Sequence, residues 1–329
     1  MNDEPTELVR LLPDPARHDL PKHRHEFLRE RFMQQIDEPP DVAAEAAPPA
    51  WRRRRRILIR ALTAGTTTVI VALWAVSAFG FGVGKFWAGQ TEAGDLLDRI
   101  ALVAANSTDI PPADRVRDDQ FEYVETYGGF GGLAHDANGN ETVVPLMPHR
   151  RQIWKSVDGA QAGLLRDPRV SPGDINLGPA WDASLGNPTF RYLTTLTTNP
   201  DVLLAKIYLQ TWGAGPNPQQ EAFVTIGDVM RESVVPAGLA EALYKAAARI
   251  PGVTVINDVV DALGRHGVAI ARTHAGQRTE WIFDRGTLQF LGERSVMTEQ
   301  TEWGPAGTVT GSTAIVVRAI VDRPGQLPH

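Results

Sequence analysis

Residues Ala61 to Gly84 read ALTAGTTTVIVALWAVSAFGFGVG, and this stretch decides how the rest of the chain is organised. Its 24 residues carry no charge and lie between Arg60 and Lys85. As an α-helix it would reach about 36 Å, more than the roughly 30 Å hydrocarbon core of a bilayer. A buried core helix this long would carry a polar face, and a signal peptide has a shorter apolar run nearer the first residue. We therefore predict a transmembrane helix over residues 61–84.

Basic residues beside this stretch set its predicted orientation. Residues 52–56 are all arginine and Arg60 follows, whereas Lys85 stands alone on the other side. The positive-inside rule then places the N-terminus in the cytoplasm. Anionic head groups attract such arginines by about 1 kcal/mol each, so no nucleic-acid site is needed to explain them. The chain is predicted to be a single-pass protein of the cell membrane, with a cytoplasmic tail over 1–50, a basic juxtamembrane segment over 51–60, the transmembrane helix over 61–84 and an extracytoplasmic domain over 90–329.

The cytoplasmic tail contains one amphipathic segment, over residues 22–36. Leu28, Phe32 and Ile36 recur at four-residue intervals there, and a linker rich in proline and alanine follows over 37–50. A helix of about fifteen residues with nothing to pack on is marginal in water. Three alternatives stay open: the tail is disordered, it lies on the bilayer, or helix 22–36 binds a cytoplasmic regulatory protein.

The outer domain has a composition that leaves only packing to stabilise it. Residues 85–329 hold 21 Lys plus Arg against 28 Asp plus Glu, and the chain has no cysteine. An acidic domain does not suit a polyanionic partner, and without cysteine it has neither disulfides nor thiolate metal sites. A domain of about 240 residues is large enough to fold on its core alone.

Hydrophobic periodicity divides this domain into helices and strands. A helix over 91–106 is followed by a strand over 120–127 and by a hairpin whose arms, 152–157 and 160–165, flank Asp158-Gly159. The glycine-rich stretch Gly128 to Asn140 lacks the lysine of a phosphate-binding loop and is interpreted as a flexible connection. Further helices are expected over 201–212, 223–230 and 236–250, and strands over 253–260, 267–273, 278–283, 287–296 and 313–321.

These elements predict an α+β fold, one curved antiparallel sheet covered by helices. Alternation along the last strands places one set of side chains on a common apolar face: Val253, Val255, Ile270, Trp281, Phe283, Ile315 and Val317. The helices over 201–212 and 239–250 are the expected lids. A complete fit would make an ordinary core, whereas a gap would leave an apolar cavity of about 300 to 1,000 Å³, with Trp281 facing a bound ligand.

No residue pattern indicates a catalytic, cofactor or metal site. The Asp182 to Gly186 segment, DASLG, lacks the first glycine of a nucleophile elbow around Ser184. Three clustered aspartates lack the glycine and distal glutamate of a calcium loop, and no outer histidine has the spacing of a zinc site. These residues are Asp114, Asp118, Asp119, His135, His149, His266, His274 and His329, and the pair His23 and His25 in the tail lacks accompanying cysteines.

Several phrases of the outer domain resemble those of an uncharacterised actinobacterial family of single-pass membrane proteins. They are PAGLAEALYKAAARIPGV over 236–253, DALGR over 261–265, IFD over 282–284 and LGER over 291–294, with Leu193 to Asp201 and Glu7-Leu8-Val9 as further matches. The layout resembles that of membrane regulators that pair with sigma factors. The outer domain is similar in outline to the half-barrels of lipoprotein carriers and stress sensors.

That family has no assigned activity, so the resemblance names no function, and our leading hypothesis is a noncatalytic envelope protein rather than an enzyme. Its outer domain would bind a lipid-like or protein ligand, and its tail would signal to a sigma-factor-type regulator. The tail lacks the His and Cys pattern of zinc-type anti-sigma proteins. Two alternatives stay open, an extracellular hydrolase anchored to the membrane and a scaffold without signalling.

Overall fold

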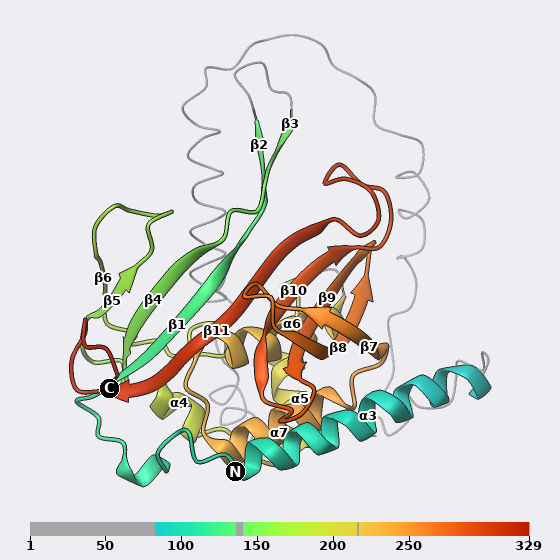
Figure 1. The fold of residues 1–329 in the computed structure, drawn as a ribbon. Coiled ribbons are helices and arrows are strands. Elements are labelled where there is room, and N and C mark those ends of the chain that lie inside the picture. The colour runs from blue at the N-terminus through green and yellow to red at the C-terminus, as the bar shows by residue number, and fades with distance from the viewer. Residues whose placement is uncertain (1–82, 136–140, 216, 329) are drawn as a thin grey trace, which may run out of the picture. The chain divides into compact units, whose positions relative to one another are not determined.

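The computed structural model describes residues 83–135, 141–215 and 217–328 (Figure 1). The predicted tail helix 22–36, the basic segment 51–60 and the predicted transmembrane helix up to residue 82 lie outside these residues. Among the helices that are described, none combines the length and the apolar character needed to cross a membrane. Residues Gly84–His329 form one compact unit.

The unit is built on a nine-stranded antiparallel sheet, which confirms the predicted α+β class. Its strand order is β6-β5-β4-β1-β11-β10-β9-β8-β7, so that the last five strands form a meander and β11 pairs with β1. The predicted hairpin is present, with Gln152 of β4 opposite Arg166 of β5. The bounds are β1 Phe121–Phe130, β4 His149–Ser156, β5 Gly163–Arg166, β6 Ile175–Leu177, β7 Val253–Val260, β8 His266–His274, β9 Gln277–Asp284, β10 Phe290–Met297 and β11 Val309–Val321.

Helices cover one face of this sheet (Figure 1). They are α3 Val83–Ala105, α4 Phe190–Thr194, α5 Pro200–Gln210, α6 Pro218–Glu232 and α7 Ala237–Ala247. The predicted start of α5 is confirmed, because the Asn199 side chain accepts hydrogen bonds from the backbone N–H groups of Asp201 and Val202. The short α4 was not predicted. Apolar side chains of α3, α5, α6 and α7 join those of β7, β8 and β9 in the main core.

The interpretation of Gly128 to Asn140 as a flexible connection is wrong over the residues that are described. Strand β1 continues to Phe130, and β2 Gly132–His135 pairs with β3 Glu141–Val144. A β-carbon added at Gly128 would lie 2.1 Å from the Ser312 carbonyl oxygen. The glycine therefore allows β1 to approach β11 closely, a requirement of packing that resembles flexibility in sequence.

A β-bulge changes which side chains of β11 face the helices. Ile315 pairs with Thr126 and Val317 pairs with Glu125, so Val316 is an extra residue without a partner in register. Val317 consequently packs on the other side of the sheet, with Phe121, Tyr123 and Trp154. The prediction that it shares a face with Ile315 is wrong, because one inserted residue reverses the alternation that follows.

The remaining members of the predicted apolar face are placed correctly. Val253, Ile270, Trp281 and Phe283 are buried in the main core, and Val255 packs against it. Trp281 is fully buried and stacks on Phe223 of α6 with ring centroids 3.9 Å apart. It belongs to the closed part of the core, so the expectation that it faces a ligand is wrong.

Candidate functional site

A cleft separates part of the sheet from its helical cover. Its volume is ≈ 760 Å³, within the range of about 300 to 1,000 Å³ typical of ligand pockets. It lies between the second half of α3, the segment that follows α3, α7 and the strands β10 and β11. Much of the lining is apolar, including Ile100, Val103, Ala104, Val235, Ala240, Phe290 and Ile315.

The cleft decides between the two packing alternatives left open by the sequence. The helices do not close completely over β10 and β11, and a gap remains there. Helix α7 is a lid, as predicted, through Ala237, Ala240 and Tyr244. The other predicted lid, 201–212, contributes no residue to the lining, and α3 takes its place. Helix α3 is fixed to the core by Leu97 and Ile100, which are almost completely buried.

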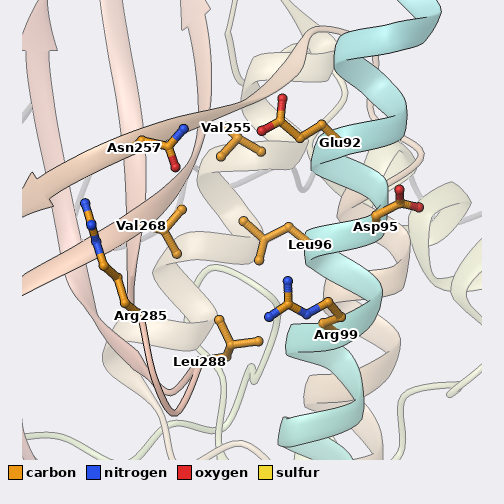
Figure 2. A pocket seen from close by; sticks show the side chains of 9 residues that line it. All are labelled: Glu92, Asp95, Leu96, Arg99, Val255, Asn257, Val268, Arg285 and Leu288. Atoms are coloured by element: carbon orange, nitrogen blue, oxygen red, sulfur yellow. The ribbon is translucent and has the colours of Figure 1, made fainter.

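A second, smaller hollow of ≈ 420 Å³ lies under the middle of α3 (Figure 2). Figure 2 shows Leu96 of α3 pointing toward Val268 and Leu288 across it. Charged side chains surround this apolar floor: Glu92, Asp95 and Arg99 on α3, and Arg285 on the opposite side. Leu288 lines both hollows, so they are neighbouring parts of one groove along α3.

Arg318 lines the larger cleft and is an unusual cation. Its Nη2 donates a hydrogen bond to the Met230 carbonyl oxygen, whereas its Nε is buried without an acceptor. Among the described residues no carboxylate forms an ion pair with it, and its guanidinium lies 5.4 Å from the centre of the Phe290 ring. Burial lowers the pKa of Arg318 to about 10, because the charged form loses its water without gaining a counterion.

Arg265 lines the same cleft, but its charge is balanced by a carboxylate. Its guanidinium forms an ion pair with Asp261 at 2.6 Å. It also donates hydrogen bonds to the carbonyl oxygens of Leu291 and Ile315. Both arginines line the same cleft, so Arg318 differs from Arg265 in lacking a carboxylate partner within the described part of the chain rather than in its surroundings.

Tyr244 is the other polar group near Arg318. Its side chain is 2% exposed, and its ring lies edge-on to Phe283 with the centroids 5.6 Å apart. Burial raises the pKa of the Tyr244 hydroxyl, and the Arg318 charge opposes part of that rise. Within the described chain this hydroxyl forms no hydrogen bond. The cleft thus has an apolar wall, the uncompensated Arg318 and the Tyr244 hydroxyl, while Arg265 is paired with Asp261. The segment after α3 adds polar lining residues, among them Asp109, whose carboxylate accepts hydrogen bonds from Ser107 and Gln289.

A second unusual group, Glu293, lies in the closed core. Its Oε2 is buried without a hydrogen-bond partner, as is Nε1 of Trp281. Burial raises the pKa of Glu293 to about 7. The Arg231 charge opposes this rise, while Asp228 and Glu232 add to it. Neither Arg318 nor Glu293 carried a signal in the sequence, because a charged residue within a strand pattern does not reveal which face it occupies.

The structure does not assemble the predicted polar residues into a catalytic site. His149 pairs with Asp167 at 3.0 Å, and His266 pairs with Asp258 at 3.3 Å on the surface. No group of three metal-ligating side chains occurs in the part of the chain that is described. His274 ends β8. The residues that the structure describes do not include His23, His25 or His329, nor the side chain of His135.

The serine and the aspartates considered for catalysis are held separately. Ser184 forms a tight turn with Asn187. Asp118 pairs with Arg191 and Asp119 with Arg117, while Asp114 lies in a short 3₁₀ turn, Ala113–Arg115. The two carboxylates have different arginine partners, so they do not form a catalytic pair.

Comparison with protein-family models, curated proteins and solved structures finds no match to this chain. The resemblance of residues 236–294 to an actinobacterial family therefore stays a prediction.

Proposed function

We propose that this protein is a noncatalytic, membrane-anchored envelope protein whose outer domain binds a lipid-like ligand in the cleft under α3. The observation that carries the proposal is the ≈ 760 Å³ gap between α3, α7 and strands β10 and β11. Around Trp281 and Phe223 the helical face of the sheet is closed by packed side chains, whereas this cleft and the smaller hollow beside it are open. A cleft of this size with a largely apolar lining suits an apolar ligand.

The position of α3 in the chain supports a role in signalling. Val83 and Gly84 end the predicted transmembrane helix and also begin α3. The helix that covers the cleft is therefore the next element in sequence after the predicted membrane anchor. A ligand that contacts Val103 and Ala104 would act on this helix. From there the signal would reach the tail segment 22–36 and a cytoplasmic regulator of the sigma-factor type.

The experiment also has to consider the two alternatives from the sequence, an anchored hydrolase and a scaffold without signalling. A membrane-anchored hydrolase needs a nucleophile beside a base, and the described serines include none whose hydroxyl bonds His149 or His266. A scaffold without signalling needs no ligand at all. Ligand binding in the cleft therefore separates our proposal from the scaffold.

The experiment measures binding of the uncharged fluorescent probe N-phenyl-1-naphthylamine to residues 84–329. The wild-type unit is expected to bind one equivalent with enhanced fluorescence. Ala104→Trp should abolish the signal because the indole fills the cleft, while Ala306→Trp on an exposed loop should leave it intact. Equal fluorescence in all three proteins, or none in the wild type, would reject the cleft as a ligand site.

A further inference from the structure

We propose that the ligand of the cleft is an amphiphile with an anionic head group, a carboxylate or a phosphate, and that Arg318 binds this head. The inference rests on the proposed function, since it requires an apolar ligand in the cleft. It goes further because it specifies the chemistry of the ligand and the end of the cleft at which the head lies.

The first reason is the cost of leaving Arg318 without a counterion. A guanidinium taken out of water is destabilising unless an anion or several acceptors replace its hydration. Arg318 has one carbonyl acceptor, on Met230, and its Nε is buried without a partner. The contact with the Phe290 ring offsets only part of that cost. A bound anion would supply the counterion and the hydrogen-bond acceptor for Nε that Arg318 lacks among the described residues.

The second reason is that the strand is shaped to place this cation inside. If Val316 were paired in a regular strand, alternation from Ile315 would direct Arg318 to the opposite face of the sheet. The bulge turns it toward α6 and the cleft, where it contacts Met230. Bulges commonly redirect a side chain at a functional site.

The third reason is the set of side chains that line the cleft together with Arg318. Tyr244 of α7 lies close enough for the Arg318 charge to act on its hydroxyl, which is unpaired within the described chain. A hydroxyl and a guanidinium together can donate several hydrogen bonds to one carboxylate or phosphate. The apolar residues Val103, Ala104 and Phe290 line the same cleft and would contact the hydrocarbon tail.

The test compares three probes of equal tail length on the full-length protein in dodecyl maltoside, by native mass spectrometry. They are palmitate, hexadecyl phosphate and uncharged hexadecanol. One equivalent of at least one anionic probe should bind about tenfold or more tightly than hexadecanol, the effect of a charge-assisted hydrogen bond. This comparison needs no variant, so it stands even if a substituted protein folds poorly.

Substitution then assigns the effect to one residue. Arg318→Met should lower the affinity for the anionic probe about tenfold and change that for hexadecanol by less than about twofold. Arg323→Met, on an exposed turn after β11, is the matched control and should change neither. If hexadecanol binds as tightly as both anionic probes, or if Arg318→Met keeps the preference, the head-group inference is wrong while the lipid site stands. If no probe binds, the proposed function itself fails.

Discussion

Glu293 gives the outer domain an unusual dependence of stability on pH. Its pKa is raised from 4.5 to about 7 by burial, so the folded protein keeps a proton that the unfolded chain releases between these values. The unfolding free energy should therefore fall as pH rises through this window. The rise of this pKa from 4.5 to about 7 corresponds to about 3 to 4 kcal/mol above pH 7.

Replacing the carboxyl by an amide of the same shape tests this value. Glu293→Gln cannot ionise, so it should be more stable than the wild type at pH 8 by about 3 to 4 kcal/mol. Below about pH 4 the Glu293 carboxyl is neutral in the folded and in the unfolded protein, so the two proteins should have nearly equal stability. Carboxyl groups whose pKa is lowered, such as those of Asp174 and Asp284, make the unfolding free energy rise with pH instead. Their contribution is the same in the wild type and in Glu293→Gln, so it cancels in the comparison.

The assay is urea unfolding of residues 84–329 at several pH values between about 4 and 8, followed by tryptophan fluorescence. Glu302→Gln, at an exposed position, is the control and should change the unfolding free energy by less than about 0.5 kcal/mol at every pH. The reasoning is refuted if Glu293→Gln is less stable than the wild type at pH 8. That result would mean that Glu293 is ionised in the fold and stabilised by Arg231.

Three further predictions concern packing, composition and topology. Gly227→Ala should destabilise the domain by about 1 to 3 kcal/mol in chemical unfolding, because the new β-carbon would lie 2.4 Å from Nε1 of the enclosed Trp281. Gly94→Ala in α3, with no atom within 4 Å, should instead gain up to about 1 kcal/mol from helix propensity. The melting temperature of residues 84–329 should be indifferent to reductant and chelator, because the chain has no cysteine and the described residues hold no metal-ligand cluster; a fall on chelation would contradict this. A reporter fused before Arg52 should be active only in the cytoplasm and one fused after Gln90 only outside, and the reverse pattern would overturn the predicted orientation.

Local patterns in the sequence were sufficient for most elements of the outer domain. The Asn199-Pro200 start of α5 and the apolar alternation of β7 to β9 depend on a few neighbouring residues, and the structure confirms both. Side-chain caps and periodicity act over one or two turns or strands, so they can be recognised without knowing the fold.

The candidate site depended on contacts between residues far apart in the chain. Nothing near Val316 indicates a bulge, which exists only because β11 pairs with β1 almost two hundred residues earlier. That bulge moves Val317 to the other face and Arg318 to the cleft. In the same way, the gap under α3 lies between elements that are far apart in the chain, α3, α7, β10 and β11. The sequence by itself determined most of the helices and strands and most of their apolar faces. The tertiary structure alone decided the face of Val317 and which charges those faces enclose, because these depend on pairing between distant strands.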